Sequence, residues 1–268
     1  MAVFLYCRLQ RIIQNMINYL KSMRRKYSNE NNTLKYLKYA CGEILLVAFG
    51  ILVALSIDNW NETRKENELE IVYYCKIKED LEVDRNKLSS ISEAVVTRQK
   101  VSKRLLLNLH STPEDKRVIM SDYLAAVRSD TFFPSKAAIS DLISSGKLAL
   151  IQNETLKKNV LQYYTDMDNS LKIIRSNREE VTNRIFGYPN ILEMGIHQTF
   201  YRGDYGEDLV ALLPDVNWQT DKNNPYFKKF EEHIGIAIVV NAREKQIVGD
   251  IIAKIDSLLT PLNEACKV

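Results

Sequence analysis

The sequence predicts an all-α protein in which one transmembrane helix is followed by an elongated antiparallel extracytoplasmic helical bundle. Residues 44–55 hold no polar side chain, which indicates a helix surrounded by lipid. The whole sequence has only six prolines, so helix breakers are rare. Beyond the apolar run, the apolar residues recur at steps of three, four or seven, which is typical of helices that pack on one face.

The predicted membrane span covers residues 36–57. As a helix, these residues rise about 33 Å, enough to cross a hydrocarbon core of about 30 Å. The run without polar side chains is shorter, at 44–55, and a run of that length also occurs in buried core helices. The flanks favour the membrane, because Lys38 and Glu43 lie where long side chains reach the headgroups. Aromatic residues of the interfacial kind flank both ends: Tyr36, Tyr39 and Trp60.

The charge distribution predicts the orientation of the span. Residues 1–39 contain eight Lys and Arg against one acid, and the residues that follow the span hold more acids than bases. Because basic flanks stay in the cytoplasm, we expect an inner (plasma) membrane protein with a cytoplasmic N-terminus and an extracytoplasmic C-terminal domain. The predicted division is a basic cytoplasmic arm at 1–35, a transmembrane helix at 36–58 and a helical-bundle domain at 59–268.

A cleaved secretory signal is the alternative interpretation of this segment. Ala54, Leu55 and Ser56 have the small-x-small form of a cleavage site, and a basic segment precedes the apolar run. A secretory signal, however, comprises about 15 to 30 residues in all, whereas this apolar run begins only at Ile44. We therefore expect an uncleaved anchor.

Three motifs around and beyond the span indicate a lineage. They are Gly42-Glu43-Ile44, Asn59-Trp60-Asn61-Glu62, and a Ser-Gly turn followed by a helix that closes on a Tyr pair in residues 141–164. With these motifs the chain resembles an uncharacterised family of single-pass membrane proteins common in Bacteroidota, defined by a domain of unknown function. The resemblance implies a topology but no activity. It also implies that residues 1–15 are an upstream extension and that Met16 is the natural start.

The segments after Trp60 predict a bundle of three long helices. Residues 59–110 contain neither Pro nor Gly and predict the first, of about 52 residues. A short helix follows at 113–130, opened by the cap signal Thr112-Pro113, and another at 135–145, stopped by Gly146. These short helices would supply a fourth side.

The second and third long helices carry clear apolar seams. The seam of the second is formed by Leu156, Val160, Tyr163, Met167, Leu171, Ile174, Val181 and Ile185. Residues 187–224 hold most of the remaining Gly and Pro and predict an irregular, functional or mobile connection. Pro225 then opens the third long helix.

Polar residues interrupt both seams. The second helix passes through Asn177 and Arg178, and the third passes through Asn241 and Lys245. We hypothesise that these four side chains face one another as a polar layer, which can serve as a ligand pocket or fix the helix register. Exposure to solvent where the bundle splays apart is the alternative.

Cys75 and Cys266 are candidates for a disulfide. Both lie in the domain expected to face an oxidising compartment, whereas Cys7 and Cys41 lie on the reducing side or its membrane edge. If the third helix returns toward the membrane, the two sulfurs reach a similar height. On a chain-entropy argument, the bridge would contribute about 4 to 5 kcal/mol. Two unpaired thiols are the alternative.

Inside the span, three residues carry possible functions. Gly50 and Ala54 form a small-xxx-small pair that lets two spans approach closely, so they are a candidate helix-dimer face. Glu43 is an intramembrane acid, and such acids are candidates for proton handling or partner contact. Its place near the cytoplasmic edge favours plain snorkelling.

The sequence predicts no catalytic, cofactor-binding or metal-binding residues. His110, His197 and His233 are isolated, and no phosphate loop, dinucleotide turn or paired CxxC is present. The net charge of +3 combines +5 over residues 1–58 with −2 over 59–268, so the basic part faces lipid and no nucleic acid is expected.

We expect a non-enzymatic, cofactor-free cell-envelope interaction or scaffolding protein. Its predicted partners are the lipid bilayer and either another protein or a second copy of the chain. The alternative is a sensory or ligand-binding ectodomain that signals through a separate partner.

Overall fold

The computed structural model describes residues 14–15, 18, 21–22, 33–111, 115–188, 191–213 and 216–267. Within these residues every regular element is a helix and none is a strand, which confirms the all-α class. The chain divides into two compact units, Met1–Glu66 and Asn67–Val268. Several predictions fall outside the described residues: most of the basic arm, Met16, Cys7, the cap at 112–114, and the side chains of Tyr36, Lys38 and Tyr39.

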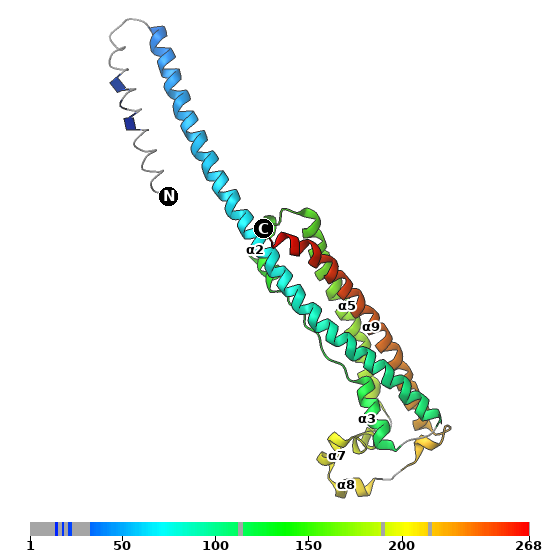
Figure 1. Cartoon of the computed structure of the whole chain (residues 1–268). Coiled ribbons are helices and arrows are strands. Elements are labelled where there is room, and N and C mark those ends of the chain that lie inside the picture. Colours follow the sequence, from blue (N-terminus) through cyan, green and yellow to red (C-terminus); the bar gives the residue numbers. More distant parts are fainter. Residues whose placement is uncertain are drawn as a thin grey trace. The chain divides into compact units, whose positions relative to one another are not determined.

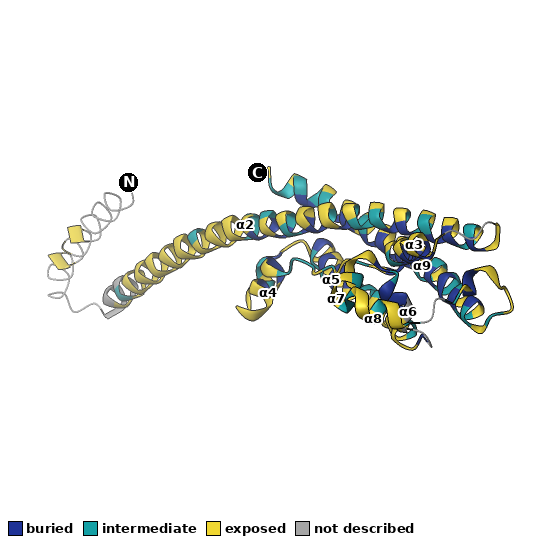
Figure 2. Cartoon of the chain, turned by 90° about the horizontal axis from the view of Figure 1, so that it is seen from below, coloured by how far each residue is buried: buried dark blue, intermediate teal, exposed yellow. Residues whose placement is uncertain are grey.

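Helix α2 (Thr33–Ser111) runs through the unit boundary and includes both the predicted span and the predicted first bundle helix. In the described part of the chain, it is the one helix long and apolar enough to cross a membrane. Its most apolar window buries none of its residues, and Figure 2 draws this stretch in the colour of exposed residues. Large apolar side chains in this stretch, such as those of Ile44 and Phe49, are 68% and 69% exposed.

The second unit contains the remaining helices. In chain order they are α3 (Lys116–Val127), α4 (Ala137–Ser144), η1 (Lys147–Leu150), α5 (Glu154–Phe186), α6 (Ile191–Ile196), α7 (Thr199–Tyr205), α8 (Glu207–Leu212), η2 (Trp218–Thr220) and α9 (Pro225–Ala265). The three predicted long helices are confirmed as α2, α5 and α9, which Figure 1 shows as the longest rods of the structure. Short helices lie within residues 187–224, where the sequence indicated little helical pattern. Helices of six or seven residues have too few turns to show a periodic pattern of apolar residues.

Local caps explain where several helices begin and end. The side chains of Asp115, Asn153 and Asn224 accept hydrogen bonds from backbone N–H groups in the first turns of α3, α5 and α9. Pro225 occupies the first turn of α9, where its missing N–H costs nothing. Gly146 has φ of 70° just after α4, a left-handed conformation that glycine adopts without strain, as predicted for a helix stop.

The segment from α3 to η1 descends along α2 and forms the fourth side of the bundle. Acids of α2 accept backbone N–H groups of this segment in reverse order: Asp84 from Ser135, Asp80 from Ala138, and Glu70 from Gln152. Asp84 is fully buried, and this burial raises the pKa of its carboxyl. Because the chain has returned by this route, α5 starts again at the same end as the bundle part of α2 and runs parallel to it.

Helix α9 runs antiparallel to both other long helices. Its ion pairs with α5 are Lys254–Asp166, Glu244–Arg178 and Glu232–Arg184, and its contacts with α2 are Asp256–Arg85, Glu244–Arg98 and Glu231–His110. In each series the residue numbers on α9 decrease as the residue numbers on the partner helix increase, as expected for antiparallel helices. The predicted antiparallel arrangement therefore holds for α9 against α2 and α5, and for the returning segment 116–152 against α2.

Two apolar clusters form the core of the bundle. The first cluster includes Leu81 and Leu88 of α2, Tyr163 and Met167 of α5, and Val248 and Ile255 of α9. The second cluster includes Leu105 and Leu109 of α2, Tyr123 of α3, Val181 of α5, and Phe230 and Ile234 of α9. All three long helices contribute to both clusters, so each long helix also crosses the region between them.

His233 lies in the second cluster and is 3% exposed. Its Nδ1 lies 3.4 Å from the Tyr123 hydroxyl, and its ring meets that of Tyr188 edge to face. Burial lowers the pKa of His233, Lys229 and Arg184 lower it further, and Glu232 raises it. The neutral imidazole is therefore the form that this core accommodates.

This burial predicts a loss of stability in mild acid. A lowered pKa in the folded state means that the unfolded chain binds the proton first, so stability falls as pH drops below about 6.5. In urea unfolding at pH 7.5 and 5.5, the free energy of unfolding should decrease by at most about 1.4 kcal/mol per pH unit for this group. His233→Leu should remove that part of the decrease, and His110→Gln, an exposed control, should leave it. An unchanged pH dependence in His233→Leu would show that the histidine titrates normally.

Candidate functional site

The core region between the two apolar clusters is polar. Five side chains form this polar layer: Arg98 and Ser102 of α2, Arg178 of α5, and Asn241 and Glu244 of α9. Ser102 and Asn241 are fully buried, and Glu244 and Arg98 expose 4% and 6% of their surfaces. Charged side chains are rarely buried this deeply unless they are paired. The stability of this layer therefore depends on how its charged groups are paired.

Glu244 joins the three long helices. Its Oε1 accepts a hydrogen bond from Arg98 Nη2 at 2.6 Å, and its Oε2 accepts one from Arg178 Nε at 2.7 Å and another from Arg178 Nη2. One carboxylate thus binds a guanidinium from α2 on one oxygen and a guanidinium from α5 on the other. Charge-assisted bonds of this kind are stronger than neutral ones, and their geometry is restrictive.

Asn241 completes the network. Its Oδ1 accepts from Arg178 Nη2 at 2.7 Å and from Arg98 Nε at 3.3 Å. Its Nδ2 donates to the Ala126 carbonyl at 3.0 Å and to Ser102 Oγ at 3.3 Å, which ties in the end of α3. An asparagine amide has two donor hydrogens and an accepting oxygen, and all are used. The layer therefore connects four helices through two adjacent turns of α9.

Arg178 is the incompletely satisfied member of the layer. Its Nη1 is buried and, among the residues that the structure describes, has no hydrogen-bond partner. Burial lowers the pKa of the Arg178 guanidinium, Glu244 raises it, and the charge of Arg98 lowers it again. Two guanidiniums thus share one carboxylate in the described layer, which leaves an excess positive charge and a free donor.

A cavity of about 170 Å³ adjoins the layer, and we call it the layer pocket. Leu88, Ile91, Leu171, Ile174, Val248 and Phe132 supply its apolar surface. Arg178 and Glu244 line it from the layer, and Arg175, Ser129, Asp130 and Thr131 complete the lining. Leu88 and Val248 are buried, whereas Asp130 and Arg175 are exposed, so the pocket leads from solvent to the polar layer.

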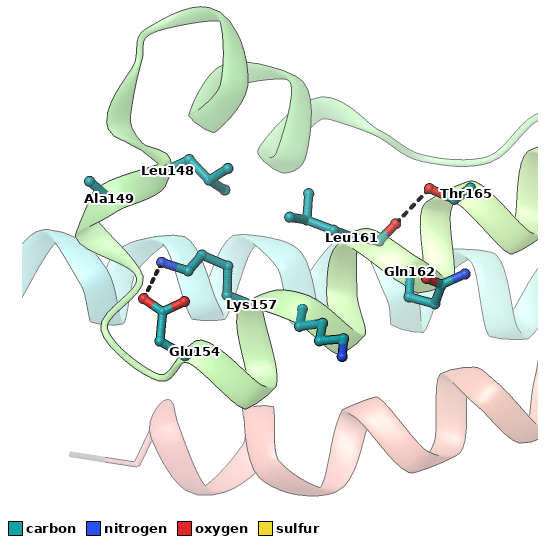
Figure 3. A pocket seen from close by; sticks show the side chains of 8 residues that line it. Leu148, Ala149, Glu154, Lys157, Leu161, Gln162 and Thr165 are labelled. Atoms are coloured by element: carbon teal, nitrogen blue, oxygen red, sulfur yellow. Dashed lines mark hydrogen bonds and ion pairs between the residues drawn. The ribbon is translucent and has the colours of Figure 1, made fainter.

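A second hollow lies on the outer face of α5 and is lined by η1 and the first turns of α5 (Figure 3). Several of its polar groups already have partners: Lys157 Nζ lies 2.6 Å from Glu154 Oε1, and the Thr165 hydroxyl donates to the Leu161 carbonyl. Lys158 and Gln162 lie in the same rim, and Gln162 donates to Asp166. This groove offers no buried unsatisfied group, so the layer pocket is the better candidate site.

The structure brings together two of the four residues predicted for the polar layer. Arg178 and Asn241 are hydrogen-bonded, as hypothesised. Asn177 is half-buried and takes part in none of the layer's hydrogen bonds in the described chain. The prediction for Lys245 is wrong, because this side chain is exposed and Glu244 holds the inward position. Glu244 and Lys245 lie three and four residues after Asn241, so both are near the same face of α9. Of the two, the Glu244 carboxylate is the group that can pair with two guanidiniums.

Sequence reasoning missed Arg98, Ser102 and Glu244. Arg98 and Ser102 are four residues apart between the core positions Val95 and Leu105. The same kind of polar interruption that marked the other two helices was therefore present in α2 as well. Glu244 lies three residues after Asn241, so a search for charge complementary to Arg178 would have favoured it over Lys245.

Cys75 and Cys266 are joined in a disulfide in the structure. Their Cα atoms are 5.5 Å apart, and 191 residues separate them in sequence. The bond fixes the end of α9 to α2 beside the first apolar cluster, against which Cys266 packs. The geometry expected for a returning third helix thus places these two residues together, whereas Cys41 is an exposed free cysteine.

The other predicted site residues lie in the exposed part of α2 in the first unit. Glu43, Gly50 and Ala54 are all exposed, and a Cβ on Gly50 would meet nothing within 4 Å. The Gly50 and Ala54 face is open for a second helix, so the dimer prediction stays a prediction. Within the described residues, no group of three or more His, Cys, Asp and Glu gathers in a way that could hold a metal ion.

The layer predicts opposite outcomes for two neighbouring residues of α9. Glu244→Gln leaves two buried guanidiniums without their carboxylate, so it should lower the free energy of unfolding by about 3 to 5 kcal/mol. Lys245→Met changes an exposed side chain and should alter it by less than about 0.5 kcal/mol. Denaturant unfolding of both variants measures the difference. Equal effects from the two substitutions would contradict the structure.

Comparison with known proteins now supplies the lineage. A family of unknown function, DUF6090, matches residues 43–179, just over half of the chain. The matched part begins at Glu43 in the predicted span and ends one residue after Arg178. No curated protein and no solved structure matches the chain. The Bacteroidota origin implied by the motifs stays a prediction. The chain belongs to the family of unknown function DUF6090.

Proposed function

We propose that this chain is a single-pass membrane protein of the cell envelope whose extracytoplasmic bundle binds another protein or holds a complex together. The observation that carries the proposal is the exposed apolar stretch of α2. Its large apolar side chains from Ile44 to Ile57 are all exposed, and in the described part of the chain none of its most apolar window is buried. Contiguous apolar surface of this extent is costly in water and favourable in a bilayer.

Two features support the orientation. The residues before the span are strongly basic, which favours retention of the N-terminus in the cytoplasm. The Cys75–Cys266 disulfide lies in the second unit, and disulfides persist in oxidising compartments such as the bacterial periplasm. A single crossing of the inner membrane places the basic residues in the cytoplasm and the disulfide in the oxidising compartment.

Exposed apolar residues support the interaction role. Phe186, Phe200 and Leu212 are 75%, 76% and 80% exposed, and they lie at or between the end of α5 and the end of α8. Exposed apolar surface is a feature of protein interaction sites. The proposal therefore includes a protein partner or a second copy of the chain and no enzymatic activity.

A ligand-sensing ectodomain that signals through a separate partner is the second candidate. The layer pocket favours it, because the pocket reaches a buried guanidinium that lacks one hydrogen-bond partner among the described residues. Pockets with apolar walls and a few convergent polar groups are typical of small-molecule sites.

Topology is tested with reporters. Alkaline phosphatase, which is active only outside the cytoplasm, should be active when fused after Val268, since the bundle follows a single crossing. The matched control is the same enzyme fused after Lys35, before the span, where it should be inactive. The reverse pattern of activities would overturn the orientation.

The interaction role is tested by photo-crosslinking in native membranes. A photoreactive amino acid at Phe200 or Leu212 should give a crosslinked band that contains a second envelope protein or a second copy of the chain. The same amino acid at Lys172, exposed on α5, is the control and should give none. Absence of any adduct from both test positions would count against a binding role for this end of the bundle.

A further inference from the structure

The layer pocket has one charged group with an unmet bonding requirement. Arg178 exposes only 12% of its side chain and lines the pocket. Its Nε and Nη2 are used by Glu244 and Asn241, while Nη1 is buried without a partner in the described chain. A buried unsatisfied donor on a charged group costs more than one on a neutral group. A bound acceptor would remove that cost.

The charges around the pocket favour an anionic acceptor. Glu244 is shared between Arg98 and Arg178, so the inner end of the pocket carries one excess positive charge. At the mouth, Arg175 and Asp130 are both exposed and carry opposite charges, which offset each other. The buried positive charge at the inner end therefore determines that the pocket favours a negatively charged ligand. A planar carboxylate matches the geometry of the guanidinium donors.

The walls and the volume of the pocket determine the polarity and size of the part of the ligand beyond its anionic group. Apolar side chains of α2, α5 and α9, together with Phe132, surround most of the pocket. Its volume of about 170 Å³ is close to that of a cavity of about 150 Å³ that holds benzene. A fully charged or sugar-like molecule would leave its polar groups unpaired against these walls.

The wall opposite the helices is held by a separate anchor. Ser129 to Phe132 belong to the non-helical segment between α3 and α4. The bifurcated hydrogen bond from the Ser135 N–H to both oxygens of the buried Asp84 carboxylate fixes the end of that segment against α2. This wall of the pocket is therefore fixed before a ligand binds, which lowers the entropic cost of binding.

We propose that the layer pocket binds a small monocarboxylate with an apolar body, about seven to ten non-hydrogen atoms in all. The carboxylate binds the Arg178 guanidinium, which turns its buried Nη1 toward the cavity to donate, and the apolar body packs against Ile91, Leu171 and Phe132. This inference names the ligand class for the sensing candidate. It does not depend on the protein-interaction role, because binding is measured on the chain alone.

The test is isothermal titration calorimetry on the full chain in nanodiscs. Four probes cover the shapes that the volume allows: benzoate, phenylacetate, hexanoate and 3-methylbutanoate. Each is compared with its neutral amide, which has the same shape and enters lipid at least as readily. At least one carboxylate should bind saturably, and its amide should bind at least tenfold more weakly.

Variants connect the binding to the pocket. Arg178→Gln should weaken the carboxylate at least tenfold while leaving the Arg98–Glu244 pair intact. Arg184→Gln, the same change on a half-buried arginine of α5 that does not line the pocket, should leave affinity unchanged. Leu171→Phe fills the pocket without altering its charges and should abolish binding, which decides the matter if Arg178→Gln fails to fold.

Three results would overturn the inference. They are no binding by any of the four carboxylates, equal binding of a carboxylate and its amide, and retained binding in a folded Leu171→Phe variant. The topology and crosslinking experiments are unaffected by these outcomes, so failure of the pocket and failure of the proposed membrane role are distinguishable.

Discussion

The bundle depends on the contact between one carboxylate, that of Glu244, and two guanidiniums, those of Arg98 and Arg178. Because a buried charge without a partner costs several kcal/mol, the three groups have to meet. They come from α9, α2 and α5, so the contact between them fixes the axial register of each long helix relative to the other two. Leucine-rich seams alone tolerate slippage, whereas a polar layer specifies one register. The apolar clusters on either side supply burial, and the layer determines which residues are buried together.

The same contact explains why a pocket lies beside the polar layer. A guanidinium and a carboxylate cannot fill space as interlocking apolar side chains do, and the segment between α3 and α4 is not helical here. The cavity between Leu88, Phe132 and Val248 follows from that change of packing. Arg178 thereby acquires two roles, since two of its nitrogens hold the helices together and the third is left for a ligand. Asp84 and the Cys75–Cys266 disulfide fasten the surrounding segments to α2 at other heights.

Most of the helices could be predicted from sequence, because Pro, Gly and apolar spacing are local signals. The lengths of α5 and α9 and the stop at Gly146 followed from such signals. The layer was only half predictable. Breaks in the seams identified Arg178 and Asn241, but the choice between Glu244 and Lys245 required matching charges between different helices, which apolar spacing within one helix does not provide. The descent of residues 116–152 along α2, which makes α2 and α5 parallel, rests on bonds between residues up to 82 positions apart, and spacing carries no information about them.

A double-mutant cycle between Arg178 and Glu244 tests the central claim most directly. The single variants Arg178→Gln and Glu244→Gln and the double variant are unfolded in denaturant, and the coupling free energy is obtained from the four stabilities. If this contact sets the register of the long helices, the coupling should lie near the upper end of the range for interacting residues, about 2 to 3 kcal/mol. A coupling within about 0.3 kcal/mol of zero, with each single variant as stable as the native chain, would contradict the account.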